Sequence, residues 1–235
     1  MNSGTLYIVA TPIGNLEDLT FRASRILSEV TVIYAEDTRV SRKLLDRYKI
    51  TTPLRSYREA APSDQVEQTL QQIITTLQSG NSVAYVSDAG TPGVSDPGCY
   101  LVKRISAVGC VIVPIPGASA LPVLLSMCGL SIQRPLFVGF LPKKKGHQTL
   151  MRQLHQAIIN GIVDGILFYE SPERIVKLLG ELSNWGIPLQ VCMVRELTKI
   201  HEEIIRDSLE GLIITLSKRS NIKGEISLVI SPNPL

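Results

Sequence analysis

The chain of 235 residues has little of several residue types that often reveal a function. Aromatic residues make up only 5% of it, so leucine, isoleucine and valine must build most of the core. Its four cysteines are scattered, without metal-ligand spacing or the density of a disulfide scaffold. Its three histidines show no mutual spacing and no acidic neighbour pattern for a triad or a zinc site. We therefore expect no metal site and interpret the histidines as surface or packing residues.

Long apolar runs and a strong charge of either sign are also absent. No uncharged apolar run reaches the ~18 residues that a membrane-spanning helix needs. The first residues lack the charged and apolar regions of a signal peptide. We therefore expect a soluble, cytoplasmic protein with no membrane partner. The net charge of +3 permits an RNA partner but does not require one.

Short apolar runs alternate with helical patterns along the chain. The alternation predicts an α/β fold with a mostly parallel N-terminal sheet. The last three strands are spaced too closely for a helix between each pair, which predicts a mixed C-terminal sheet. The predicted strands are 5–10, 31–35, 82–87, 111–115, 165–169, 190–195, 203–207 and 225–230.

The chain is long enough for two small domains, and we place the boundary near residue 117. This gives an N-terminal α/β domain over 1–117 and a C-terminal α/β domain over 118–235. A hinge is predicted over 131–135. Helix starts are predicted at four capping residues, which are Asp18, Ser63, Asp96 and Ser171.

Six segments of polar or small residues follow the ends of apolar strands. Strand ends that share one edge of a sheet also share one crevice, where ligands of α/β folds bind. Glycine and alanine there, as in Gly117 and Ala118, leave room for a flat ligand against the backbone. None of the segments is a Walker A loop or a GxGxxG fingerprint. Each is also compatible with an ordinary turn or helix cap. The segments are 10–18, 35–39, 87–97, 115–120, 168–174 and 195–199.

The order of the motifs in these segments is more specific than any one of them. Together they closely resemble the ribosomal RNA small subunit methyltransferase I family, a branch of the tetrapyrrole-methylase-like group of enzymes. The resemblance covers nearly the whole chain. Its motifs are Thr11-Pro12-Ile13-Gly14-Asn15-Leu16, Ala35-Glu36-Asp37-Thr38-Arg39, Ser87-Asp88-Ala89-Gly90-Thr91-Pro92, Asp96-Pro97-Gly98, Pro116-Gly117, Gly139-Phe140-Leu141-Pro142, Phe168-Tyr169-Glu170-Ser171 and Arg195-Glu196-Leu197-Thr198-Lys199.

The resemblance implies a two-domain tetrapyrrole-methylase-like fold that binds S-adenosylmethionine. The N-terminal domain is then the substrate and cofactor side, and the C-terminal domain completes the cofactor cleft. It implies a homodimer whose partner is 16S rRNA or the small ribosomal subunit. The implied reaction is methylation of the ribose 2′-oxygen of a cytidine in the decoding region of 16S rRNA.

The resemblance and the reaction that it implies also suggest roles for residues. The candidates for a catalytic base are Asp37 and Glu170, with Glu196 behind them. RNA phosphates are expected at Arg39, Arg42, Lys43, Lys143, Lys144 and Lys145. Arg39 could instead be a fixed partner that orients Glu36 or Asp37. Cofactor contacts are expected at Pro12, Ile13, Gly14, Ser87, Asp88, Ala89, Gly90, Thr91, Pro92, Val94, Pro116, Gly117, Ala118 and Tyr169.

Two other functions remain open at this point. An enzyme of the same group that methylates a tetrapyrrole, such as a uroporphyrinogen or precorrin, would share the fold and the cofactor. A non-catalytic module that binds an adenosine ligand or RNA would hold its ligand without turnover. Val40 and His147 stand where members of the family often carry histidine and arginine.

Overall fold

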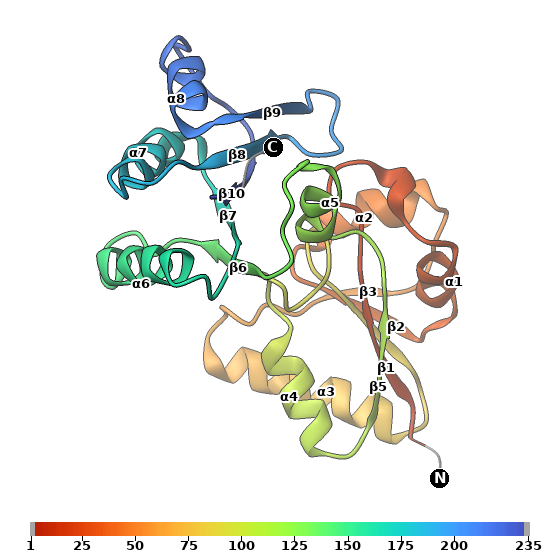
Figure 1. Cartoon of the computed structure of the whole chain (residues 1–235). Coiled ribbons are helices and arrows are strands. Elements are labelled where there is room, and N and C mark those ends of the chain that lie inside the picture. The colour runs from red at the N-terminus through yellow and green to blue at the C-terminus, as the bar shows by residue number, and fades with distance from the viewer. Residues whose placement is uncertain (1–2, 233–235) are drawn as a thin grey trace. The chain divides into compact units, whose positions relative to one another are not determined.

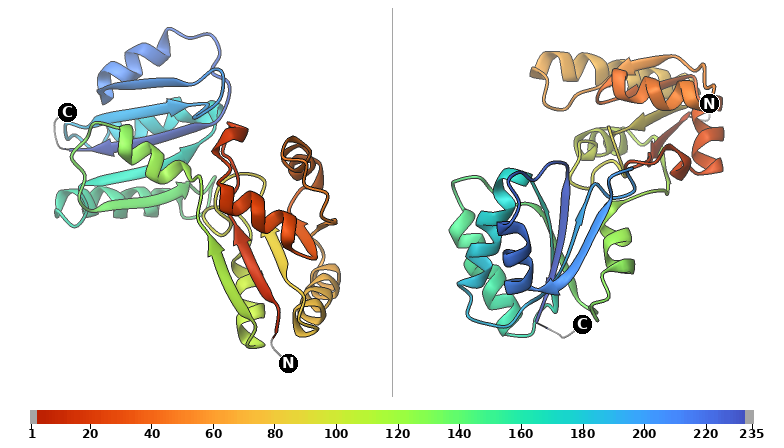
Figure 2. Two further views of the ribbon diagram at one scale, coloured as in Figure 1. Left: turned by 90° about the vertical axis from the view of Figure 1, so that its right-hand side faces the viewer. Right: turned by 90° about the horizontal axis from the view of Figure 1, so that it is seen from above.

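The computed structural model describes residues 3–232, which form two compact units divided between Ser119 and Ala120. The division lies two residues beyond the boundary predicted near residue 117. Each unit has one five-stranded sheet with helices packed against it (Figures 1 and 2).

The first unit is built around an entirely parallel sheet. Its strands lie in the order β3-β2-β4-β1-β5. The strands are β1 (Thr5–Val9), β2 (Val32–Ala35), β3 (Leu54–Ser56), β4 (Val83–Val86) and β5 (Val111–Ile115). The helices between them are α1 (Phe21–Glu29), α2 (Thr38–Arg47), α3 (Ser63–Gln78) and α4 (Cys99–Ala107), with a short 3₁₀ turn η1 (Leu16–Asp18) before α1.

Helices cover both faces of this sheet, as parallel sheets require. On one face α3 and α4 pack against the strands through residues that include Leu70, Ile73 and Leu101. On the other face α1 and α2 do the same through Ile26, Leu27 and Leu44. Of the three inner strands, β2 and β4 are buried along their whole length, which leaves only their ends and the loops that follow for contact with a ligand.

The second unit has a mixed sheet, as predicted. Its strands lie in the order β6-β7-β10-β8-β9, with β6 and β7 parallel and the other pairs antiparallel. The strands are β6 (Pro135–Phe140), β7 (Gly165–Glu170), β8 (Gln190–Arg195), β9 (Glu203–Ser208) and β10 (Ile226–Ser231). The helices are α5 (Ala120–Met127), α6 (His147–Ile159), α7 (Pro172–Ser183) and α8 (Leu209–Ser217).

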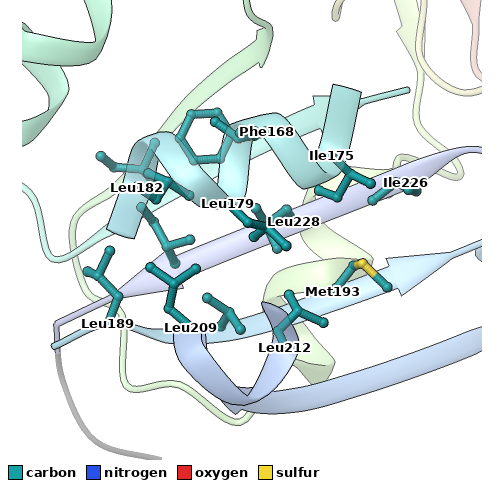
Figure 3. Close-up of a cluster of buried hydrophobic side chains, with 14 of the residues drawn as sticks. Phe168, Ile175, Leu179, Leu182, Leu189, Met193, Leu209, Leu212, Ile226 and Leu228 are labelled. Atoms are coloured by element: carbon teal, nitrogen blue, oxygen red, sulfur yellow. The ribbon is translucent and has the colours of Figure 1, made fainter. Parts of the chain in front are cut away.

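The core of the second unit lies between its sheet and α6, α7 and α8. Figure 3 shows Leu179 of α7 beside Leu228 of β10, and both belong to one buried cluster with Leu182 of α7 and Leu212 of α8. Helix α5 packs against β10 from the other face of the sheet. The face that carries α5 therefore has less helical cover, and this matters for the aromatic residues described below.

Some local predictions were wrong. Strands β3 and β6 were not predicted, because β3 has only three residues and β6 begins with a proline and contains Gly139. A helix, α8, does fit between β9 and β10. The predicted hinge over 131–135 lies inside the second unit, where the amides of Gln133 and Arg134 donate to Asp164.

Three of the four predicted caps also need correction. Thr20 caps α1 instead of Asp18, because its hydroxyl accepts a hydrogen bond from the Ala23 amide at 3.0 Å. Pro62 precedes α3, so Ser63 is the first helical residue. Helix α4 begins after Gly98 and not at Asp96, because Gly98 has a φ of +134°, which is not helical and which glycine tolerates best. Ser171 does stand at the N-cap of α7.

Candidate functional site

The ends of three strands of the first unit are joined by backbone hydrogen bonds. Thr11, just past β1, exchanges two such bonds with Gly90, just past β4, at 2.8 and 3.0 Å. On its other side, the amide of Ala10 donates to the carbonyl of Ile115 at the end of β5 at 3.1 Å. Three of the predicted segments therefore lie side by side at one sheet edge.

Side chains reinforce this connection and extend it to the remaining strands, β2 and β3. The Thr91 hydroxyl donates to the Ala118 carbonyl at 3.2 Å. The Asp37 amide donates to Asp88 at 2.9 Å and thereby joins the ends of β2 and β4. Arg58, past β3, donates from Nε to the Glu36 carbonyl at 3.1 Å. All five carboxyl ends of the sheet form one connected edge, which we call the first edge.

Two glycines of the first edge are required by close packing. A Cβ added at Gly117 would lie 3.0 Å from the Cβ of Ala10. Gly117 therefore lets the end of β5 approach the end of β1, whereas the sequence interpretation had it leave room for a ligand. Gly90 has a φ of +75°, and a Cβ there would lie 3.3 Å from Cγ2 of Ile13. At both positions the absence of a side chain allows neighbouring segments of the first edge to pack closely.

The first edge fits a ligand that binds to main-chain atoms. It exposes small residues at Gly14, Ala89 and Gly117, next to polar ones such as Asp88. Beside them the hydroxyl oxygen of Thr11 is buried and has no hydrogen-bond partner. It is one of seven such atoms among residues 3–232, and its place at a strand end, among exposed backbone, suits a ligand that would supply the partner.

The carboxylates at this edge differ in their affinity for protons. Burial raises the pKa of Glu36, and the negative charges of Asp88 and Asp96 raise it further. The hydrogen bond from the Arg39 side chain holds the pKa of Asp37 well below its usual range. Asp37 also caps α2 by accepting from the Arg39 amide at 2.8 Å. Glu36 is therefore the stronger base of the two, although the sequence prediction named Asp37.

A pocket of about 490 Å³ opens beside the end of β3. Arg58 is its one charged lining residue, and Tyr57 and Val66 form part of its apolar wall. Sequence reasoning missed this pocket because it missed β3. The other lining residues are Ser56, Ala60, Ala61, Pro62, Gln65 and Thr69.

The second unit ends in a differently built edge, formed by the ends of β6, β7 and β8 and the starts of β9 and β10. We call it the second edge. Glu170, whose side chain is 1% exposed, pairs with Arg174 at 3.2 Å and accepts from the Ser171 amide at 2.7 Å. Arg174 also donates to the Leu141 carbonyl at 2.9 Å. The candidate base Glu170 is thus committed to holding β6, β7 and α7 together.

Tyr169 lies between two phenylalanines. Its ring centroid is 5.0 Å from that of Phe137 and 5.6 Å from that of Phe140, both in edge-on geometry. Phe140 is 59% exposed, which is unusual for a phenylalanine in a strand. Sequence reasoning singled out Tyr169 and missed its neighbour Phe137, because β6 was not predicted.

His147 has an acidic neighbour in space, Glu181, which the sequence pattern did not indicate. Its Nδ1 contacts the Pro142 carbonyl at 2.8 Å, and its Nε2 contacts Glu181 of α7 at 2.6 Å. A carbonyl oxygen only accepts, so Nδ1 donates to it. His155 instead stacks on Trp185, which agrees with a packing role.

The motif over 195–199 is occupied by internal ion pairs. Lys199 contacts Glu196 and Glu225, each at 3.0 Å. Arg195 pairs with Glu203 at 3.0 Å, and Arg219 pairs with the same carboxylate at 2.5 Å. The hydrogen bond from Arg219 lowers the pKa of Glu203 to about 2. These charges act on one another and stabilise the second edge.

The structure thus gathers most predicted cofactor residues at the first edge, while Tyr169 and Glu170 belong to the second unit. The cationic candidates Arg39, Arg42 and Lys43 are exposed on α2, and Lys143 to Lys145 are exposed in the loop after β6. Among residues 3–232 no group of three or more His, Cys, Asp or Glu side chains could hold a metal ion. The helices described over the same range are too short or too polar to cross a bilayer.

Comparisons with known proteins agree with one another. The family described as Tetrapyrrole (Corrin/Porphyrin) Methylases matches residues 5–213. Over 99% of its length the chain is 41% identical to a ribosomal RNA small subunit methyltransferase I of Halalkalibacterium halodurans, of which it covers 77%. Over 96% of its length it is 41% identical to the protein of the same name from Borrelia garinii, of which it covers 98%.

A solved structure is similar in fold. Uroporphyrin-III C-methyltransferase of Thermus thermophilus, in complex with S-adenosylhomocysteine, superimposes with a TM-score of 0.65. The alignment covers 96% of this chain and 97% of that one, at 19% identity. The predicted fold class is confirmed.

Proposed function

Because this chain belongs to the ribosomal RNA small subunit methyltransferase I family, and so methylates ribosomal RNA with S-adenosylmethionine as donor, we propose which atom it methylates. The proposed target is the ribose 2′-oxygen of a cytidine in the decoding region of 16S rRNA. The motifs from Thr11 to Lys199 support this choice, since they occur in the order typical of the family. The observation that carries the assignment of the site is the connected first edge, with its small side chains and the unpartnered hydroxyl of Thr11.

The residues that would hold S-adenosylmethionine lie along the first edge. When bound, this donor supplies an activated methyl group on a sulfonium. The protein's contribution is to fix positions, which the hydrogen bonds between Thr11 and Gly90 and between Thr91 and Ala118 do without large side chains. The predicted contacts at Pro12, Ile13 and Gly14, at residues 87–94 and at 116–118 lie on this frame. Tyr169 of the second unit stays a separate prediction.

A ribose hydroxyl is a weak nucleophile, so a base that takes its proton would help the reaction. Glu36 is our first choice, because burial and two neighbouring carboxylates raise its pKa and strengthen it as a base. Asp37 is held by Arg39 and Glu170 by Arg174, so a positioning task suits both better. Glu36 was not named as a base from the sequence, although it lies in the same motif.

RNA phosphates would meet the exposed cations. Arg42 and Lys43 on α2 and Lys143 to Lys145 after β6 are free to contribute charge at the surface. Arg39 is committed to Asp37 at 2.6 Å and is the weakest candidate. We further propose that the protein works as a homodimer in the cytoplasm, as the family resemblance implies.

Methyl transfer to isolated small ribosomal subunits tests the proposal. Subunits lacking the modification are incubated with the protein and labelled S-adenosylmethionine, and the RNA is digested and mapped by mass spectrometry. We expect one new 2′-O-methylcytidine in the decoding region. Parallel reactions with protein-free 16S rRNA and with uroporphyrinogen distinguish the substrates. Methylation of uroporphyrinogen and not of RNA would establish the tetrapyrrole alternative, and binding of the donor without transfer to either would indicate a non-catalytic module.

A further inference from the structure

An irregularity in β6 gathers three aromatic rings on one face of the second sheet. Phe137 pairs with Leu167 of β7, but the register then shifts, so that Gly139 pairs with Phe168 and Phe140 with Tyr169. In a regular strand, residues three apart point to opposite faces. The extra residue at the bulge puts Phe137 and Phe140 on the same face as Tyr169. Gly139, with a φ of +66°, allows this turn of the backbone.

These three rings, which we call the aromatic shelf (Phe137, Tyr169 and Phe140), do not belong to the main core. The core residues Phe168 and Leu228 face α7 and α8, whereas Tyr169 lies on the opposite face. Tyr169 holds the two phenylalanines edge-on, and Phe140 at the end of the row is 59% exposed. A bulge that carries a large apolar ring into solvent opposes burial, so a ligand is its best explanation.

The loop that follows Phe140 is rich in lysine, and hydrogen bonds anchor its first residues. Lys143, Lys144 and Lys145 follow Phe140 within five residues and are all exposed. The carbonyl of Leu141 accepts from Arg174, and that of Pro142 accepts from His147, which Glu181 fixes on the other side. An exposed ring beside a positioned row of cations matches unpaired nucleic acid, whose bases stack on rings while its phosphates meet lysines.

We propose that the aromatic shelf is a stacking site for one unpaired base of the RNA substrate, received on Phe140, with the adjacent phosphates on Lys143 to Lys145. Phe140 then positions the RNA and takes no part in the chemistry. The inference rests on the proposed function for the identity of the RNA. It does not depend on which nucleotide is methylated.

The test measures binding of the full chain to a fluorescently labelled decamer of uridylate and to a decamer of the same length with abasic sites. Given the usual strength of stacking on an aromatic side chain, Phe140→Ala should weaken binding of the uridylate roughly 5- to 150-fold. Phe140→Trp should retain the affinity. The abasic decamer should bind weakly to all three proteins, with no difference between them.

Two further variants serve as controls. Ile162→Ala removes a 63% exposed apolar side chain of the same unit, beyond the far end of α6, and should leave both affinities unchanged. Replacing Lys143, Lys144 and Lys145 by glutamine should weaken both decamers alike and flatten the salt dependence, because about 0.7 counterion is released per phosphate of a single strand.

Several results would overturn the inference. If Phe140→Ala and Ile162→Ala changed the affinity for the uridylate decamer equally, the Phe140 ring would make no specific contribution to binding. Equal losses for the uridylate and abasic decamers would exclude stacking. If Phe140→Ala weakened binding of S-adenosylhomocysteine as much as binding of the uridylate decamer, the shelf would be part of the cofactor site. If the loss of RNA binding followed the dissociation of a dimer in sedimentation experiments, the shelf would be a subunit interface. If the wild-type protein failed to methylate ribosomal RNA, the proposed function would be wrong, independently of the binding results with the decamers.

Discussion

The two sheet edges of this protein are held together in different ways. At the first edge, backbone atoms make the connections between β1, β4 and β5, and charged groups enter only towards β2 and β3. At the second edge, ion pairs around Glu170, Lys199 and Glu203 make them. Where backbone hydrogen bonds join the strands, the side chains stay available to a ligand. Where ion pairs join the strands, the charged side chains are already bound to one another. The first edge is therefore suited to binding a ligand, whereas the ion-paired groups of the second edge serve its structure.

The largest expected effect is on stability, at Glu170. Removing one partner of a buried ion pair costs about 3–5 kcal/mol, because the other charge is left unpaired. Glu170→Ala should lower the free energy of unfolding by about that amount, whereas Asp88→Ala, which removes one exposed acceptor at the first edge, should cost about 1 kcal/mol or less. Urea unfolding measures both. Equal losses would abolish the contrast between the edges.

The next effect concerns catalysis. Glu36→Gln should slow single-turnover methyl transfer at least about 10²-fold, which is the lower range for a general base. Binding of S-adenosylhomocysteine should be unchanged, because Glu36→Gln keeps the shape of the side chain. Glu196→Gln at the second edge should transfer methyl groups at close to the normal rate. Slow transfer by Glu196→Gln together with normal transfer by Glu36→Gln would instead place the base in the second unit.

A pair of glycines separates ligand binding from backbone strain. Gly90 and Gly109 have nearly equal φ values of +75° and +73°, but a Cβ at Gly109 would meet nothing within 4 Å. Alanine at either position costs roughly 1 kcal/mol of stability. Only Gly90→Ala should also weaken binding of S-adenosylhomocysteine, about tenfold, since it displaces Ile13; a tenfold change corresponds to about 1.4 kcal/mol. Calorimetric titration compares them, and equal affinities would remove Gly90 from the site.

The smallest expected effect is on the pH dependence of stability. One carboxyl at each edge should contribute, and the two contributions should change with pH in opposite directions. The lowered pKa of Glu203 stabilises the fold fully above its ordinary value of 4.5, and this contribution is lost as the pH falls towards about 2. The raised pKa of Glu36 acts the other way, so that stability declines as the pH rises above 4.5.

Unfolding curves between pH 2.5 and 7 test this pair of effects. Glu203→Gln should flatten the acid side of the profile and Glu36→Gln the neutral side, each by less than about 2 kcal/mol because both groups are partly solvated. Profiles of both variants that match the wild type would show that neither carboxyl is coupled to folding.

Sequence patterns predicted the regular parts of this fold well and its irregular parts poorly. The stripes Leu19 to Val30 and Ile175 to Leu182 are buried as their helical spacing requires. Strands β3 and β6 escaped because a three-residue run and a glycine bulge leave no periodic signal. The strand-end motifs showed where ligand chemistry could lie. They could not show that Gly117 serves packing, or that Arg39 pairs with Asp37 and not with Glu36, since both depend on contacts in space.

Hydrogen exchange with and without S-adenosylhomocysteine tests the assignment of the first edge most directly. Bound ligand should slow exchange of the amides over residues 11–14, 87–94 and 116–118, with much smaller changes around 195–199. Protection confined to residues 56–69, beside the pocket at β3, or absent from all of these segments, would contradict the account.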